Sequence, residues 1–185
     1  MSVNLIESLS WVPDPRAKRG RRYPLWFLLL LVIMGTISGC MGYAALEDFA
    51  RRHYQAVSQH LQLPELGFPS DSTFRRVMIR IDFDQLAKVF NQWALDYVPL
   101  EQSESLAIDG KSIKATVTNY DRSYQNFVNV VSVFSVRQGL TVHLSQFQNK
   151  HNSEIAVVQA IVEALDLKGV LLTLDSLHCQ KKQSN

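Results

Sequence analysis

The chain has 185 residues, of which 46% are hydrophobic and 19% charged. This composition excludes a globally disordered chain and allows one packed domain or two modest ones. The net charge of +2 hides a basic cluster near the N-terminus, made of Arg16, Lys18, Arg19, Arg21 and Arg22. Such a cluster is typical of contact with nucleic acid or an anionic membrane, and a solvated loop is the alternative.

Residues 1–23 are expected to be loosely structured. Residues 23–46 carry no charge and follow the basic cluster, which is the order found in a signal anchor. Only residues 25–34 are densely apolar, and that is the length of a buried core helix with Pro24 in its first turn. Both readings stay open on hydropathy alone.

The rest of the first hundred residues is helical in pattern. Helices are predicted over residues 24–35 and 43–60, and a third runs to about Arg80 behind capping side chains at residues 70–72. Asp82 or Asp84 caps a fourth helix, which Pro99 ends. We therefore expect an all-helical domain over residues 1–100 and a second domain over residues 101–185.

The second domain changes to strand patterns. A short strand is expected at residues 106–109, a polar loop at 111–125, a central strand covered on both faces at 127–136, and a strand with one wet face from Leu140. Asn152 is expected to cap a helix, and residues 170–174 form a strand that returns parallel to the first. The order strand-strand-strand-helix-strand makes the chain α+β overall.

Two acids stand at the ends of expected strands, Asp109 and Asp175. Carboxylates on neighbouring parallel strands can hold a pair of divalent ions against a phosphodiester. Taken alone, Asp109 could instead begin an Asp-Gly turn. Lys111 is either a phosphate contact or a solvated turn lysine, and Arg75 and Arg76 either read DNA or cover an exposed helix face.

The cysteines and His178 do not indicate a metal site. Cys40 and Cys179 are the only cysteines, so a disulfide framework and a zinc site are both excluded. His178 and Cys179 lack further ligands at a suitable spacing, and local packing is the expected role. This cysteine usage is typical of a reducing cytoplasm.

Around the first acid the chain reads Ala107-Ile108-Asp109-Gly110-Lys111-Ser112-Ile113, and around the second Thr173-Leu174-Asp175-Ser176-Leu177-His178-Cys179-Gln180-Lys181. These segments, with residues 152–155 and 165–169, resemble the catalytic strands and helix of the H-repeat-associated group of bacterial insertion-sequence DDE transposases. Residues 14–16, 21–25 and 68–77 resemble the small N-terminal associated domain of that group. The run at residues 150–154 departs from the family's shorter pattern, and the third acid of the family has no counterpart here.

The resemblance implies an incomplete ribonuclease-H-like α/β domain behind the helical one. It implies that Asp109 bridges two Mg²⁺ ions about 3.5–4 Å apart while Asp175 binds one, for cutting DNA at an element end and joining it to target DNA. The implied partners are DNA, a second copy or a full-length transposase, and neither a membrane nor a small-molecule substrate.

With two of three acids, the chain is expected to be a truncated transposase that is inactive alone. The alternatives are a DNA-binding or regulatory fragment, and a small protein anchored in a membrane by residues 24–46.

Overall fold

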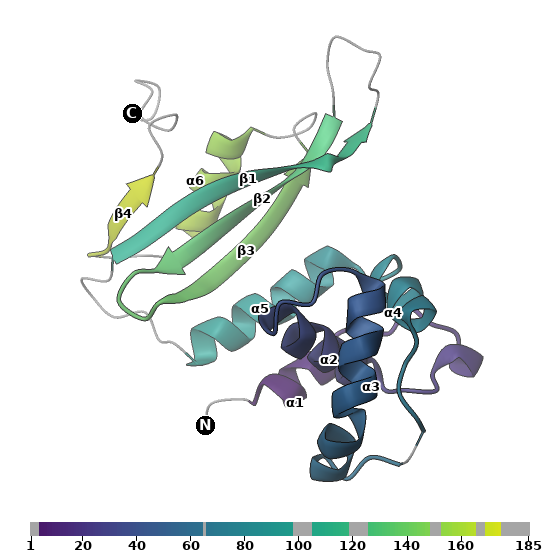
Figure 1. Cartoon of the computed structure of the whole chain (residues 1–185). Coiled ribbons are helices and arrows are strands. Elements are labelled where there is room, and N and C mark those ends of the chain that lie inside the picture. Colours follow the sequence, from purple (N-terminus) through teal and green to yellow (C-terminus); the bar gives the residue numbers. More distant parts are fainter. Residues whose placement is uncertain are drawn as a thin grey trace. The chain divides into compact units, whose positions relative to one another are not determined.

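The computed structural model of the protein describes residues 4–64, 66–97, 105–118, 126–148, 153–165 and 169–174 (Figure 1). It is an α+β chain whose internal contacts divide it into a helical unit, Val3–Val89, and a sheet unit that begins at Phe90. The division falls inside a helix. The domain boundary predicted at residue 100 lies outside the described residues and stays a prediction.

The helical unit contains the four helices that the sequence predicted. They are α2 (Leu25–Ile37), α3 (Tyr43–His60), α4 (Asp71–Met78) and α5 (Phe83–Tyr97), whose later half belongs to the sheet unit. Asp82 caps α5, because its Oδ1 accepts hydrogen bonds from the backbone N–H groups of Asp84 and Gln85 at 2.9 and 3.2 Å.

The prediction of a loose N-terminus was wrong. Residues 4–23 hold helix α1 (Leu5–Ser10) and the 3₁₀ helix η1 (Lys18–Gly20). Asn4 caps α1 by accepting the N–H of Ile6 at 3.0 Å, and Leu9 and Val12 are buried in the core. Local caps and two apolar anchors therefore order a segment that has no long periodic pattern.

Helix α2 supplies the centre of the helical core. Phe27, Leu28 and Leu31 are each 1% exposed or less, and Phe27 packs edge-to-face on Tyr54 with ring centroids 5.8 Å apart. The stretch Lys18–Ile37 is long and apolar enough to cross a membrane by length and composition alone. The burial of its largest side chains among the other helices of the unit favours the core-helix reading over the anchor.

The sheet unit has four strands and one helix among the residues that the structure describes. They are β1 (Ser105–Thr118), β2 (Asn126–Ser135), β3 (Leu140–Gln148), α6 (Glu154–Ala164) and β4 (Leu171–Leu174). The sheet order is β3-β2-β1-β4; β1 pairs antiparallel with β2 and parallel with β4, and β2 pairs antiparallel with β3 (Figure 1). The predicted order and the parallel return are confirmed.

Three details of the predicted sheet were wrong. β1 continues through residues 111–118, which were expected to form a loop, because residues 111–113 and 118 pair with β2 and their backbone groups are satisfied there. β2 is covered on one face only: Val131 and Val133 are fully buried, whereas Phe134 is 39% exposed. Ser153, rather than Asn152, caps α6 by accepting the N–H of Ala156 at 3.3 Å; Asn152 itself lies outside the described residues.

One side chain of α5 is bonded directly to the sheet within the sheet unit. The amide of Asn91 donates to the carbonyl of Leu144 at 2.9 Å and accepts the N–H of the same residue at 2.7 Å. An asparagine amide satisfies both backbone groups of one residue in this way, which fixes this part of α5 on β3.

Candidate functional site

Asp109 lies inside β1 and not at its end. It pairs with Ser132 of β2, whose hydroxyl donates to the Asp109 carbonyl at 3.4 Å. The Asp-Gly turn is therefore excluded, because Asp109 and Gly110 both belong to a continuous ladder. Leu106 and Ile108 are buried with α6, so the alternation of the strand puts the exposed side chain of Asp109 on the opposite face.

The parallel pair β1–β4 stops just before the two predicted acids. Its register joins Ser105 to Leu171 and ends by joining Ile108 to Leu174. Asp109 is the next residue after Ile108, and Asp175 is the next residue after Leu174. Asp175 lies outside the described residues, so its pairing with Asp109 stays a prediction.

A second carboxylate lies against β1, on the face opposite to the side chain of Asp109. The side chain of Glu154, in the first turn of α6, occupies the space above Gly110: a Cβ at Gly110 would lie 2.0 Å from Oε1 and 2.5 Å from Cδ of Glu154. Glycine at position 110 thus permits the close approach of a carboxylate to the backbone of the strand. The sequence analysis gave Glu154 no part in the site; the glycine within the strand was the available signal.

Replacing Gly110 with alanine is expected to displace the carboxylate of Glu154 and to reduce the free energy of unfolding by about 1 kcal/mol or less, since the clash is with the end of a flexible side chain. In a Glu154→Ala background the same change should stabilise by about 0.5 kcal/mol, because alanine replaces glycine in a strand without a clash. Urea unfolding of the double-mutant cycle measures this reversal of sign. Equal effects in the two backgrounds would show that the two residues do not interact.

The described part of the chain contains no group of three or more His, Cys, Asp or Glu side chains placed to hold a metal ion. The carboxylates near Gly110 lie on opposite faces of β1, with Asp109 exposed on one face and Glu154 over Gly110 on the face of α6. Carboxylate oxygens are hard ligands and suit Mg²⁺. The exposed carboxylate of Asp109 is therefore a suitable ligand for the predicted cation.

The predicted DNA contacts of the basic cluster divide into two kinds. Arg16 lies inside the helical unit with its side chain 6% exposed, and it donates to Asp14 through Nε and Nη2, each at 2.9 Å, and to the Tyr23 carbonyl at 2.8 Å. Arg21 bonds to the backbone carbonyls of Arg16 and Asp14. Arg16 therefore has a structural role in the interior of the helical unit, and the carboxylate of Asp14 compensates its charge.

The hydrogen bonds and the ion pair that Arg16 donates hold the pKa of the Asp14 carboxyl below its ordinary value of 3.8. Burial has the opposite effect on Tyr23, raising the pKa of its phenol. The Tyr23 hydroxyl donates to the Phe68 carbonyl at 3.1 Å, which ties the basic segment to the chain that enters α4. Residues 14–23 are thus held by the Arg16–Asp14 pair at one end and by the Tyr23–Phe68 hydrogen bond at the other.

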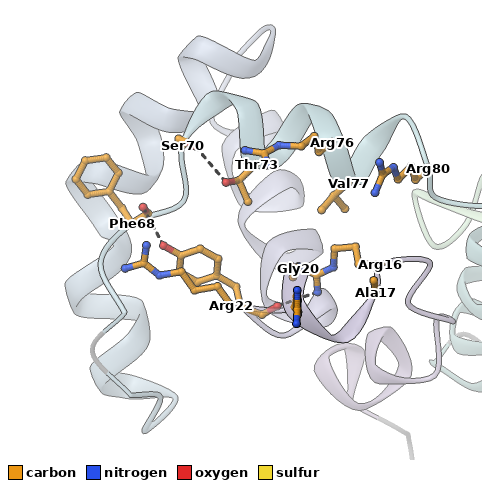
Figure 2. A pocket seen from close by; sticks show the side chains of 12 residues that line it. Arg16, Ala17, Gly20, Arg22, Phe68, Ser70, Thr73, Arg76, Val77 and Arg80 are labelled. Atoms are coloured by element: carbon orange, nitrogen blue, oxygen red, sulfur yellow. Dashed lines mark hydrogen bonds between the residues drawn. The ribbon is translucent and has the colours of Figure 1, made fainter.

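The other arginines surround a pocket of about 390 Å³ in the helical unit, which we call the arginine pocket (Figure 2). Its walls come from the segment around η1 and from α4 with its flanking residues. The lining residues are Arg16, Ala17, Arg19, Gly20, Arg22, Tyr23, Phe68, Ser70, Thr73, Arg76, Val77 and Arg80. Arg80 was not among the residues that the sequence analysis assigned to DNA.

The remaining predicted contacts lie outside the pocket. Lys18 and Arg75 are exposed on η1 and α4. Lys111 is exposed on β1, two residues after Asp109, so the turn-lysine reading is wrong and its side chain shares the face of Asp109. A phosphate contact by these three residues stays a prediction.

Comparison with known proteins identifies the class to which this arrangement belongs. The family model described as DDE_Tnp_1-associated matches residues 6–94, a range that includes every residue lining the arginine pocket. The chain is similar to the "H repeat-associated putative transposase YhhI" of Escherichia coli K12, with 32% identity over 178 residues that cover 96% of this chain and 46% of that protein.

Two further relatives extend the comparison. The "H repeat-associated putative transposase YbfD" of Escherichia coli K12 is 32% identical over 96% of this chain and 68% of its own length, and the "Putative transposase YncI" of Escherichia coli O157:H7 is 29% identical over 98% and 46%. The chain belongs to the H-repeat-associated transposase family. It spans about half the length of YhhI and YncI. No solved structure matches it.

Proposed function

We propose that this chain provides the DNA-binding N-terminal part and the first half of the catalytic domain of a DDE transposase, with Asp109 and Asp175 as metal-binding acids. The observation that carries the proposal is the register of β1 with β4, in which Ile108 pairs with Leu174. Residues that directly follow such a pair on parallel strands lie side by side if the strands continue. The pairing of the two acids is thus a direct extension of the described ladder.

The topology supports a ribonuclease-H-like domain. Three antiparallel strands in the order β3-β2-β1 are extended by β4, which lies parallel to β1 after the crossover through α6. Ligand sites in sheets with parallel strands gather at the carboxyl ends of those strands. Asp175 directly follows Leu174 in the sequence, and Asp109 directly follows the partner of Leu174, Ile108.

The expected cofactor is a pair of Mg²⁺ ions, which when bound would activate the attacking oxygen and stabilise the leaving oxygen of a phosphodiester. Asp109 and Asp175 would hold these ions. The backbone of Asp109 pairs with Ser132 of β2 and directly follows Ile108, the last residue that pairs with β4, so its carboxylate is presented from a rigid position. Lys111, on the same face, would contact a DNA phosphate.

The test is the binding of Mn²⁺ or Mg²⁺ by the 185-residue chain, followed by titration calorimetry. Asp109→Asn and Asp175→Asn should each weaken binding at least about tenfold, equivalent to about 1.4 kcal/mol, because each removes one anionic ligand. Binding is measured in place of DNA cleavage, since these residues provide two of the three acids of the family pattern and we expect no cleavage by them alone.

Asp96→Asn is the matched control for this titration. Asp96 is exposed near the end of α5 and accepts a hydrogen bond from Gln92 at 3.0 Å, which asparagine can still accept. Its replacement removes the same charge and should leave the affinity for metal unchanged. If the Asp109 and Asp175 variants bind metal as tightly as the Asp96 variant, the two aspartates do not form the site.

A second candidate function is DNA binding or regulation without catalysis, through element ends or a full-length transposase. The observation that favours it is the arginine pocket, which no acidic residue lines within the described chain. A gel-shift assay with DNA from the element ends tests this function. Retention of a shift by the Asp109→Asn variant would show that binding does not depend on the metal site.

A further inference from the structure

The arginine pocket carries an uncompensated positive charge. Five of its twelve lining residues are arginines, and only Arg16 takes part in an ion pair among the described residues. Positive charges in a concave site attract anions more strongly than the same charges on a flat surface. The pocket is therefore built for an anionic group.

Two of the pocket's arginines, Arg22 and Arg76, are held in place by hydrogen bonds to other residues. Arg22 donates to the Leu66 carbonyl and lies over the ring of Tyr23, 5.5 Å from its centroid. Arg76 donates to the carbonyl and hydroxyl of Ser72, one turn earlier on α4, at 3.0 and 3.2 Å. These bonds hold each guanidinium in place and leave it charged.

Arg19 and Arg80 line the pocket from two different segments of the chain. Arg19 belongs to η1 and Arg80 follows α4; both side chains are exposed, and no ion pair within the described ranges involves either. Two guanidinium groups that line one pocket can bind the same phosphate through separate oxygens.

Hydroxyl groups supply neutral donors at the head of α4. The hydroxyls of Ser70 and Thr73 lie 3.1 Å apart and bond to each other (Figure 2). Either proton can turn toward an anion, as hydroxyl donors rotate freely. The helix end itself does not provide the site, because the N–H of Asp71 already donates to Glu47 at 2.7 Å.

The proposed function indicates a DNA strand as the source of the anion. Phe68 lines the pocket and is 42% exposed, and its ring points away from Arg76 and Arg80 (Figure 2). The arginines and the hydroxyls, and not the ring, are therefore the groups that a phosphate would contact.

We infer that the arginine pocket binds a phosphate group of a DNA strand, with Arg19, Arg76 and Arg80 as its cationic ligands and Ser70 and Thr73 as neutral donors. The inference rests on the proposed DNA function and specifies which residues of the helical unit bind the DNA strand. The phosphate is either a backbone diester or a terminal 5′-monoester, since both present the same oxygens.

The test uses the full 185-residue chain and a fluorescein-labelled DNA single strand, made with and without a 5′-phosphate, in anisotropy titrations at several salt concentrations. The double variant R19A/R80A should raise Kd at least about tenfold and reduce the slope of log K against log salt by about 0.7, the value for one lost phosphate contact on a single strand. Both side chains are exposed, so circular dichroism and unfolding should be unchanged.

The matched control is R51A/R52A, which removes the same charge from the exposed surface of α3 in the same unit. It should change Kd by less than about threefold, because charges outside the pocket act only through the general field. A loss of affinity as large as that of R19A/R80A would overturn the inference, since net charge would then explain both.

The 5′-phosphate separates the two sources. A gain in affinity from the 5′-phosphate that R19A/R80A abolishes assigns the pocket to a terminal monoester; equal weakening of both strands by the variant assigns it to a backbone diester. If the wild-type chain binds DNA and R19A/R80A binds as tightly, the pocket inference fails while the Asp109 proposal stands. If no strand binds at all, the pocket inference fails and so does DNA binding by this chain.

Discussion

Replacing Arg16 with alanine is expected to lower the free energy of unfolding by about 3 kcal/mol. The Arg16 guanidinium is almost fully buried and donates to Asp14 and to the Tyr23 carbonyl. Its loss leaves a carboxylate that is 17% exposed and a carbonyl without their principal donor. Arg21, whose Nε lies 3.4 Å from Asp14, compensates part of the charge, which puts the effect at the lower end for a broken buried pair.

The effect of this substitution should depend on pH in a defined direction. The pKa of Asp14 is lowered in the folded protein, chiefly by the hydrogen bond from Arg16, so the stabilisation is complete above the ordinary value of 3.8 and is lost as the pH falls through the lower folded value. Urea unfolding at neutral pH and at several values below 3.8 measures this. Arg19→Ala is the control, since that side chain is exposed and should change stability by less than about 0.5 kcal/mol. An Arg16→Ala variant as stable as the control would show that Arg16 is not part of the fold.

Replacing Phe27 with alanine is expected to cost about 3–5 kcal/mol, because the ring is 1% exposed and its removal leaves a cavity in the centre of the helical unit. The ring also loses two edge-to-face contacts, with Trp26 and Tyr54. Chemical unfolding followed by circular dichroism measures the change. A drop of this size in a small protein can unfold it at 37 °C.

Ile37→Ala is the comparison that decides what kind of helix α2 is. Ile37 lies at the end of the same helix but is 82% exposed, so a core helix predicts almost no change there. A helix that spans a membrane predicts small and similar effects at the two positions, since each apolar residue contributes only a few tenths of a kcal/mol to insertion. Similar small losses for both variants would favour the anchor.

Helices α2 to α6 were predictable from their apolar patterns and local caps, whereas α1 was not. β1 was predictable only over residues 106–109. Residues 111–116 are exposed, and the strand is held by the pairing of residues 111–113 and 118 with β2, which a local pattern does not contain. Ser153 was missed as the cap of α6 because two adjacent residues of capping type compete for one position.

The candidate site divides in the same way. Spacing and strand order were enough to single out Asp109 and Asp175, and the Ile108–Leu174 register agrees with the predicted parallel return. Arg16 and Arg80 show two things that a sequence does not reveal: which charged side chains are buried, and which residues far apart in the chain line the same pocket. Arg16 counts toward a basic cluster although Asp14 neutralises it, and Arg80 is distant in sequence from η1, which lines the same pocket.

The pairing of β4 with β1 has a consequence for the order of folding. β1, β2 and β3 are joined by hairpin connections, whereas β4 must return to β1 across both hairpins and α6. Contacts between residues far apart in sequence form later, because a longer loop must be closed first. The two aspartates would therefore meet only at the final stage of sheet assembly, and the backbone amides of β4 should be the first in the sheet to exchange their hydrogens with solvent.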